Sequence, residues 1–181
     1  MELEKIKADE INIEIIDKKH NINNFKSYDL ELVKFLQEDA FQNQKQKLSV
    51  TFLWFYKNQL VSYMTLLNDK INLESNLKEF FQDKGINYQS LPALKIGRIC
   101  VDDRFLKRGL GKLMALTAIK IAQEMSKTRS GCRFITLDAK RNQDPVKDPL
   151  PFYEKIGFQK LLEKKIGPTS MYLDLQLIQE A

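Results

Sequence analysis

The sequence predicts a mixed α/β (α+β) fold, a single domain over residues 1–181 built on a central twisted mixed β-sheet. In the first half, two β-rich runs are separated by only three residues, which predicts a hairpin within an antiparallel meander. In the second half, a buried strand, a long helix and another strand follow one another, and this order predicts a parallel βαβ core. The length of 181 residues, with 43% hydrophobic and 29% charged residues, suits one well-buried globular core.

The first half alternates strand and helix patterns. Residues 11–16 alternate apolar and polar side chains, so we expect a half-buried strand with Ile11, Ile13 and Ile15 facing inward. Apolar residues at helical spacing follow, with Ser27 or Asp29 available as the N-cap. The elements expected here are a strand over 11–16, a helix over 28–47, hairpin strands over 49–56 and 60–67, and a short amphipathic helix around 73–81.

The second half carries the βαβ pattern. Its short last helix is expected to start at Pro151, which suits a first helical turn, and to stop at Gly157. The elements expected here are a mostly apolar strand over 93–101, a charged loop over 102–108, a long helix over 110–125, a strand over 132–138, a polar stretch over 140–149, a helix over 151–155, and closing strands over 158–162 and 169–178.

Composition excludes several classes of protein. The longest apolar run, 52–56, is too short to cross a membrane, and the charged N-terminus resembles no signal peptide, so we expect a cytoplasmic protein with no membrane partner. Two cysteines, Cys100 and Cys132, make no disulfide framework, and with one histidine they make no zinc cluster, so no metal is expected. His20 lies in a polar stretch and is expected to be a loop residue, which argues against catalysis by a histidine base.

Charge is distributed unevenly along the chain. Residues 95–165 contain 17 Lys and Arg against 8 Asp and Glu, a local charge of +9, whereas the remainder carries −4. Such a basic half favours an anionic ligand: a phosphorylated cofactor, a nucleic acid or an acidic protein surface. An ordinary solvated surface would give the same count, so both interpretations stay open at this point.

The segment between the apolar strand and the long helix is rich in glycine and basic residues: Lys107, Arg108, Gly109, Leu110, Gly111 and Lys112. Main-chain N–H groups at a helix N-terminus have no intrahelical partner and lie at the positive end of the dipole. Glycines let the chain approach an anion closely, so the segment is a candidate phosphate-binding loop. It matches neither a Walker A loop nor a dinucleotide-binding fingerprint, whose third glycine would fall at Met114.

A second motif follows about forty residues later and matches the pattern Phe/Leu-Tyr-Glu-Lys-x-Gly-Phe at Phe152, Tyr153, Glu154, Lys155, Gly157 and Phe158. The two motifs together resemble the GCN5-related N-acetyltransferases (GNAT family), from about residue 48 to the C-terminus. The family's phosphate loop, Gln/Arg-x-x-Gly-x-Gly/Ala, matches at Gly109 and Gly111. Its first position is Leu106 here, so a side-chain contact is missing, for which Arg104 or Arg108 would have to compensate.

The resemblance implies a GNAT-like fold and an acetyl-CoA-dependent N-acetyltransferase, with an acetyl-CoA-binding core at about residues 93–160. Acetyl would pass to a primary amine by direct attack in a ternary complex. Tyr153 would be the general acid that protonates the leaving thiolate. A main-chain N–H at the end of the apolar strand would polarise the thioester carbonyl. The implied cofactor-binding residues are Ile99, Cys100, Val101, Lys107, Arg108, Gly109, Leu110, Gly111, Lys112 and, as counterpart of an asparagine that many relatives carry, Asn142.

The general base is left open, because residues 94–101 contain no acid where many relatives have a glutamate. Asp102, Asp138, a chain of water molecules, or an amine that arrives neutral could fill the role. Arg98 is expected to meet an anionic group of a substrate or a nearby acid. Cys100 is expected to be a small buried hydrophobic residue, although an acetyl-cysteine intermediate is conceivable.

Within the family, two segments together resemble the branch that contains toxins acetylating aminoacyl-tRNA: residues 25–40, and the strand over 91–102 with Leu-Pro-Ala…Gly-Arg…Val-Asp. The acceptor is left open among a small-molecule amine, a protein and aminoacyl-tRNA, and an antitoxin partner and a homodimer are left open as well. The competing hypothesis is a non-catalytic nucleic-acid-binding module. That module would need exposed aromatic residues among the bases, whereas most aromatic residues here fall on apolar faces.

Overall fold

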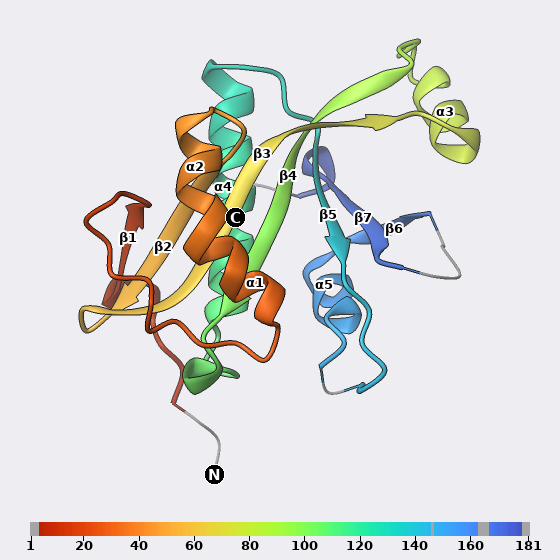
Figure 1. Cartoon of the computed structure of the whole chain (residues 1–181). Helices are drawn as coiled ribbons and strands as arrows, with labels where there is room; N and C mark the ends of the chain where they lie inside the picture. The colour runs from red at the N-terminus through yellow and green to blue at the C-terminus, as the bar shows by residue number, and fades with distance from the viewer. Residues whose placement is uncertain (1–3, 146, 163–166, 179–181) are drawn as a thin grey trace. The chain divides into compact units, whose positions relative to one another are not determined.

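The computed structural model describes residues 4–145, 147–162 and 167–178. Seven strands follow the hydrogen-bonded order β1-β2-β3-β4-β5-β7-β6, with β4 and β5 parallel, which confirms the predicted mixed sheet and the βαβ core (Figure 1). The chain divides into two compact units, Met1–Leu67 with Ile96–Ala118 and Asn68–Lys95 with Ile119–Ala181. In the described residues, no helix is long and apolar enough to cross a membrane.

The first unit contains the antiparallel meander. Its strands are β1 (Ile11–Ile15), β2 (Val50–Tyr56), the first part of β3 (Gln59–Asn72) and the last part of β4 (Ser90–Val101). β1 pairs with β2 so that Ile15 lies opposite Phe52, and β2 pairs with β3 so that Val50 lies opposite Leu66. The β2–β3 turn places Lys57 and Asn58 at φ of 48° and 62°, as a two-residue type I′ hairpin requires.

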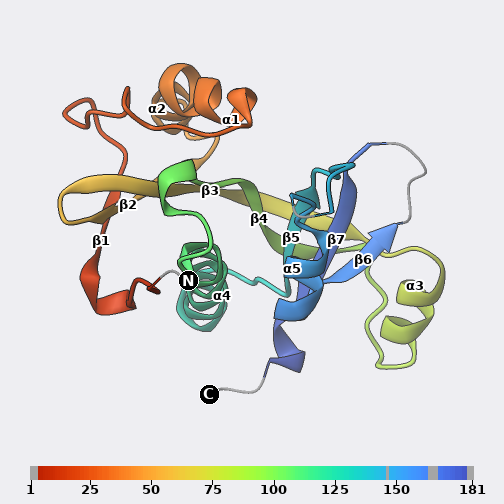
Figure 2. The ribbon, with the colours of Figure 1, turned by 90° about the horizontal axis from the view of Figure 1, so that it is seen from below.

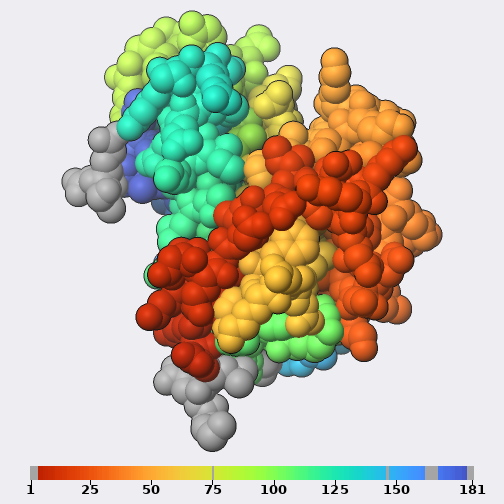
Figure 3. Space-filling model, turned by 90° about the vertical axis from the view of Figure 1, so that its left-hand side faces the viewer, coloured from red at the N-terminus to blue at the C-terminus, as the bar shows by residue number. Residues whose placement is uncertain are grey.

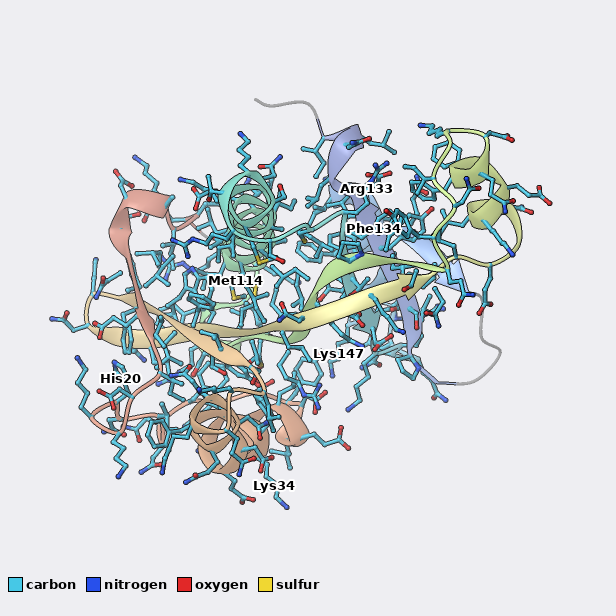
Figure 4. The ribbon with its side chains drawn as sticks, turned by 90° about the horizontal axis from the view of Figure 1, so that it is seen from above. His20, Lys34, Met114, Arg133, Phe134 and Lys147 are labelled. Carbon is cyan, nitrogen blue, oxygen red and sulfur yellow. The ribbon has the colours of Figure 1, made fainter. Side chains whose placement is uncertain are left out.

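Helices cover both faces of the strands of this unit (Figure 2). On one face lies a continuous helical segment made of α1 (Leu30–Lys34), the π-helix η2 (Phe35–Asp39) and α2 (Ala40–Lys45). The opposite face carries the first half of α4 (Leu110–Thr128), from which the buried Met114 points toward the strands (Figure 4). The core beneath α1 and α2 consists of Ile16, Phe25, Leu36, Ala40, Leu53, Leu60, Tyr63 and Cys100.

The second unit contains the last part of β3, the first part of β4, the second half of α4, and the remaining elements: α3 (Ser75–Gln82), β5 (Phe134–Ala139), α5 (Leu150–Ile156), β6 (Gln159–Leu162), β7 (Thr169–Asp174) and the 3₁₀ turn η4 (Leu175–Leu177). β5 and β6 both pair with β7 in antiparallel register. Arg133 stabilises this unit: its guanidinium makes two 2.8 Å bonds to Asp174 and lies over the rings of Phe81 and Phe134 (Figure 4).

Four features differ from the sequence prediction. The strand expected over 169–178 ends at Asp174 and is followed by the 3₁₀ turn η4. Ile13 and Ile15 are 42% and 53% exposed rather than inward-facing, because β1 is an edge strand, and Ile16 just beyond it is buried instead. The helix expected over 28–47 begins at Leu30, capped by Asp29, and contains a π-helical turn that periodicity does not reveal. β3 continues to Asn72 through a polar stretch that lacks a strong β pattern.

Candidate functional site

The loop between β4 and α4 has the geometry of an anion-binding turn. It begins with the 3₁₀ turn η3 (Asp103–Phe105), after which Lys107 and Gly109 adopt φ of +61° and +88°. The N–H of Leu113 donates to the Gly109 carbonyl at 3.1 Å. The N–H groups of residues 110–112, one turn earlier, therefore have no acceptor within the helix. They lie at the positive end of α4, which suits a phosphate group.

Two of the loop's cations face solvent and one does not. Lys107 and Lys112 are exposed. Arg108 turns toward the N-terminal segment, where its Nε donates to the Glu4 carbonyl at 2.9 Å and its guanidinium lies 5.3 Å from the ring centre of Tyr56. Its own carbonyl accepts from Ile6 at 3.0 Å, and Figure 3 shows these N-terminal residues in red beside the yellow hairpin and the green loop. The side chain of Arg108 thus has a structural partner, whereas Lys107 and Lys112 remain candidates for phosphate.

Asp102, one of the bases considered from the sequence, is enclosed. Its side chain is 0% exposed and accepts from the main-chain N–H groups of Lys26 and Arg104 and from the Arg104 guanidinium. Burial alone would raise the pKa of this carboxyl, but these hydrogen bonds hold the pKa below its ordinary value. Asp102 therefore stays ionised with its oxygens occupied, and this surrounding argues against its being the general base.

The same contacts decide whether a nearby arginine can replace the side-chain contact that is missing at Leu106. Arg104 was a candidate to replace the missing Gln or Arg contact, but its guanidinium binds Asp102 and the Asn24 carbonyl. Arg108 is engaged as well. Any phosphate bound by this loop would therefore rely on main-chain N–H groups and lysines, since Leu106 can supply only apolar contact.

Ile99, Cys100 and Val101 form the last residues of β4, directly before the loop. Burial raises the pKa of the Cys100 thiol to about 12, so the nucleophilic thiolate is not formed near neutral pH. This argues against an acetyl-cysteine intermediate. Arg98, one residue earlier than Ile99, donates to the Gly97 carbonyl and lies over the Phe35 ring at 5.1 Å.

Tyr153 lies on α5 in the second unit and is 6% exposed. Its ring packs edge-on against Phe152 and Phe158, with centroids 5.1 and 5.8 Å away. Its N–H donates to Pro149, its carbonyl accepts from Phe158, and Gly157 at φ +110° ends the helix. The motif residues therefore hold the tyrosine in a fixed orientation, as a positioned acid requires.

The loop before α5 is ordered by its own hydrogen bonds. Asn142 accepts the Asp144 N–H at 2.9 Å through its side-chain oxygen. Asp148 accepts from the Arg141 guanidinium at 3.0 Å and from the N–H of Leu150 at 3.2 Å, at the start of α5. Asn142 thus shapes the turn with its carbonyl oxygen, and its NH₂ group could donate to a ligand.

Asp138, another base considered, belongs to a polar row on the second unit's strands. One oxygen accepts from Lys95 and the other from Ser170, both at 2.7 Å. Thr136, two residues earlier on β5, donates to Asp69 at 2.6 Å. No pattern in the sequence singles out Ser170 or Asp69, which come from distant strands; only the pairing of β3, β4, β5 and β7 brings this row together.

His20 lies in a loop, as expected for this polar segment, but its side chain is only 8% exposed and has structural partners rather than being solvated. Its Nδ1 accepts the Asp17 N–H at 2.8 Å, and its Nε2 lies 2.9 Å from a Glu14 carboxylate oxygen. This contact is the main reason that the pKa of Glu14 is lowered. Among the described residues, no three His, Cys, Asp or Glu side chains are grouped so that they could hold a metal ion.

The structure therefore gathers the loop residues and the end of β4 in the first unit, and Tyr153 and Asn142 in the second. A protein-family model, the acetyltransferase (GNAT) family, matches residues 16–158, most of the chain. The chain belongs to the GNAT family. The expected enzyme class, an acetyl-CoA-dependent acetyltransferase, and the expected acetyl-CoA cosubstrate are confirmed by this membership.

Known structures share the fold along nearly the whole chain. AtaT complexed with acetyl-methionyl-tRNAfMet is 18% identical with a TM-score of 0.75, and the match covers 92% of this chain and 96% of that one. AtaTR bound with acetyl-CoA is 19% identical with a TM-score of 0.76, and a tyrosine-to-phenylalanine variant of KacT is 20% identical with a TM-score of 0.76, each covering 93% of this chain and 96% of the other. No curated protein sequence matches the chain significantly.

Proposed function

We propose that this GNAT enzyme transfers acetyl from acetyl-CoA to the α-amino group of an aminoacyl-tRNA. The observation that carries the proposal is the fold likeness to AtaT complexed with acetyl-methionyl-tRNAfMet, over 92% of this chain. The strand over 91–102 independently resembles the same branch of the family. Exposed cations on and after α4 suit a polyanionic acceptor: Lys112, Lys120, Lys127 and Arg129.

The surroundings of the two candidate bases favour an acceptor with a weakly basic amine. Asp102 is buried and saturated with donors, and both oxygens of Asp138 have partners. A lysine side chain, with pKa near 10.4, would need a strong base to attack, whereas an α-amino group with pKa near 8 is substantially neutral at physiological pH. An aminoacyl ester offers such an α-amino group, so the reaction can proceed without a dedicated carboxylate base.

Binding and proton transfer are assigned to different parts of the chain. The N–H groups of residues 107–112, with Lys107 and Lys112, bind the pyrophosphate of acetyl-CoA, and the main chain at residues 99–101 binds the pantetheine arm and polarises the thioester carbonyl. The neutral amine forms a bond to the acetyl carbon, the C–S bond breaks, and the sulfur takes a proton from the Tyr153 hydroxyl. The nitrogen releases one proton to water, and water returns a proton to the Tyr153 phenolate. A phenol with pKa near 10 is a suitable donor to a developing thiolate.

We also propose that the protein acts with an antitoxin. AtaT is known in a complex with the C-terminus of the antitoxin AtaR, in a structure that matches 93% of this chain with a TM-score of 0.72 and 16% identity. A small antitoxin gene directly beside the gene for this protein would support the proposal. Expression of the enzyme alone should arrest growth, and co-expression of that neighbour should restore it.

An acceptor screen tests the function. Radiolabelled acetyl-CoA is incubated with the protein and one of three acceptors: a mixture of charged tRNAs, a lysine-containing peptide, or a polyamine. We expect acetyl-CoA-dependent label on charged tRNA only, and none on the same tRNAs after deacylation. Label on the peptide or polyamine alone would overturn the tRNA assignment. Tight binding of tRNA without any acetyl transfer would favour the non-catalytic binding module.

A further inference from the structure

We infer that Asp102 and Arg104 form a clasp that positions the proposed acetyl-CoA loop and couples its occupancy to the helical segment 30–45. The inference rests on the proposed role of the loop in binding acetyl-CoA. Asp102 and Arg104 would act through the loop rather than by touching the substrate, so they are positioning residues.

The clasp is a closed set of charge-assisted hydrogen bonds. One Asp102 oxygen accepts from the Lys26 N–H at 2.9 Å and from Arg104 Nη2 at 2.7 Å. The other accepts from the Arg104 N–H at 3.0 Å and from Arg104 Nε at 2.8 Å. Arg104 Nη2 also donates to the Asn24 carbonyl at 3.0 Å. A two-pronged guanidinium–carboxylate pair fixes orientation as well as distance, which a single bond does not.

The clasp joins two segments that are remote in sequence. On one side, residues 24–26 lead into α1, and Phe25 packs in the core with Leu36 of the π-helix. On the other side, the Phe105 N–H donates to the Asp102 carbonyl at 2.8 Å, and the chain then turns into the loop at Lys107. A second link, from the Asp103 N–H to the Lys26 carbonyl at 2.9 Å, reinforces the junction.

Stability alone does not account for such an arrangement. Enclosing a carboxylate costs desolvation, and a buried ion pair is often no more stabilising than apolar residues of the same size. What it supplies is a single geometry. If a bound phosphate fixes the loop, the clasp transmits that constraint to residues 24–26 and the helices that follow, and a coupling of this kind is necessarily reciprocal.

The test compares two arginines that make the same kind of pair. Arg104→Gln removes the guanidinium from the clasp at a partly exposed position, so folding should survive. Arg133→Gln is the matched control, because Arg133 makes an equivalent two-pronged pair with Asp174 in the other unit. We expect Arg104→Gln to weaken acetyl-CoA binding and raise its KM about tenfold, the effect of losing one charge-assisted hydrogen bond, with little change in kcat. Arg133→Gln should lower Tm without changing acetyl-CoA affinity.

Hydrogen exchange distinguishes coupling between the loop and residues 30–45 from a purely structural role of Arg104. In the wild type, acetyl-CoA should slow amide exchange both in the loop and in residues 30–45. In Arg104→Gln at saturating acetyl-CoA, protection should persist in the loop and disappear from residues 30–45, and Arg104→Lys should restore part of it. Unchanged affinity and unchanged protection of residues 30–45 in Arg104→Gln would overturn the clasp, as would an equal loss of affinity in Arg133→Gln.

Gly111→Glu separates this inference from the proposed function. Its side chain would occupy the main-chain approach that the phosphates need, so calorimetry should detect no acetyl-CoA binding by the folded variant. If Gly111→Glu abolishes binding while Arg104→Gln behaves as wild type, only the clasp is wrong. If Gly111→Glu binds normally, the assignment of the loop itself is wrong.

Discussion

We assign Tyr153 as the general acid and Asp102 as a positioning residue because their surroundings differ. Tyr153 lies in the middle of a short helix and its ring packs against two aromatic rings, which fixes the orientation of the ring. Asp102 is a carboxylate whose oxygens are filled by donors from its own unit. The environment of Tyr153 suits a proton donor, whereas that of Asp102 suits a residue that holds the loop in one geometry. Both residues lie at motif positions in the sequence.

Tyr153→Phe should lower kcat by about 10²–10⁴-fold, the usual contribution of general acid catalysis, while the KM for acetyl-CoA stays near the wild-type value. Phenylalanine keeps the ring packing against Phe152 and Phe158 and removes the hydroxyl group. Steady-state kinetics on the true acceptor measures both constants. Near wild-type turnover would reduce Tyr153 to a core residue and assign thiolate protonation to water or another group.

Asp102→Asn should cost about 2 kcal/mol of stability at neutral pH, because it removes the charge that Arg104 and two N–H groups bind. The pKa of Asp102 is lowered by folding, so its stabilising effect is present above the unfolded-state pKa, near 3.8, and is lost as pH falls through the folded-state pKa. Denaturation curves of both proteins from pH 7 to pH 3 should therefore differ by a constant amount down to about pH 5, and converge below about pH 4. A difference that stayed constant to pH 3 would contradict this.

The π-helix between α1 and α2 packs against the buried Tyr63. Helices of this kind are frequent at functional sites. Here the buried Tyr63 hydroxyl donates to the Leu32 carbonyl at 2.7 Å, and the Tyr63 ring packs against Phe25 and Phe35. Burial raises the pKa of Tyr63, so the hydroxyl keeps its proton for this bond.

Tyr63→Phe should therefore destabilise the protein by about 1–2 kcal/mol, because the Leu32 carbonyl loses a buried partner. Tyr172→Phe is the control: the Tyr172 hydroxyl bonds to the exposed Gln159 side chain, which water can replace, so a loss below about 0.5 kcal/mol is expected. Urea denaturation compares the two variants. Equal losses would mean that the bond to Leu32 does not secure the π turn.

Gly109→Ala should destabilise the protein by about 1–2 kcal/mol, because φ is +88° and an L-residue is strained there even though a methyl group meets no atom within 4 Å. At Gly131, where the nearest atom to an added methyl is 3.7 Å away and φ is not in the left-handed region, alanine should be neutral or slightly stabilising. Thermal denaturation distinguishes them. A neutral Gly109→Ala would show that the loop can relax to another backbone geometry.

The sequence predicts where helices and strands lie better than it predicts which residues surround them in the fold. The periodicity of apolar residues and the positions of glycines predict the hairpin, α4 and α5 to within a few residues. The inward orientation predicted for Ile13 and Ile15 was wrong, because alternation indicates two faces but not whether a strand lies at the sheet's edge. The clasp and the row of Lys95, Asp138 and Ser170 could not be predicted, since their members meet only through long-range pairing.

Taken as a whole molecule, the chain combines a GNAT fold with a strongly basic second half. Residues 95–165 carry 17 Lys and Arg against 8 Asp and Glu, which suits both the phosphates of acetyl-CoA and a tRNA acceptor. Association with a polyanion through such a surface depends steeply on salt. The motifs could be recognised from local sequence, whereas the acceptor is determined by surface shape and charge that no short motif encodes.

The proposed reaction transfers acetyl to the amino acid of a charged tRNA. The most direct measurement is mass spectrometry of the 3′-terminal aminoacyl-adenosine fragment, released by ribonuclease after incubation with acetyl-CoA and the wild-type protein. The fragment should gain the mass of one acetyl group, removable together with the amino acid by mild alkali, and Tyr153→Phe should slow the gain by at least about a hundredfold. An unmodified fragment under conditions in which the enzyme acetylates another amine would contradict the account.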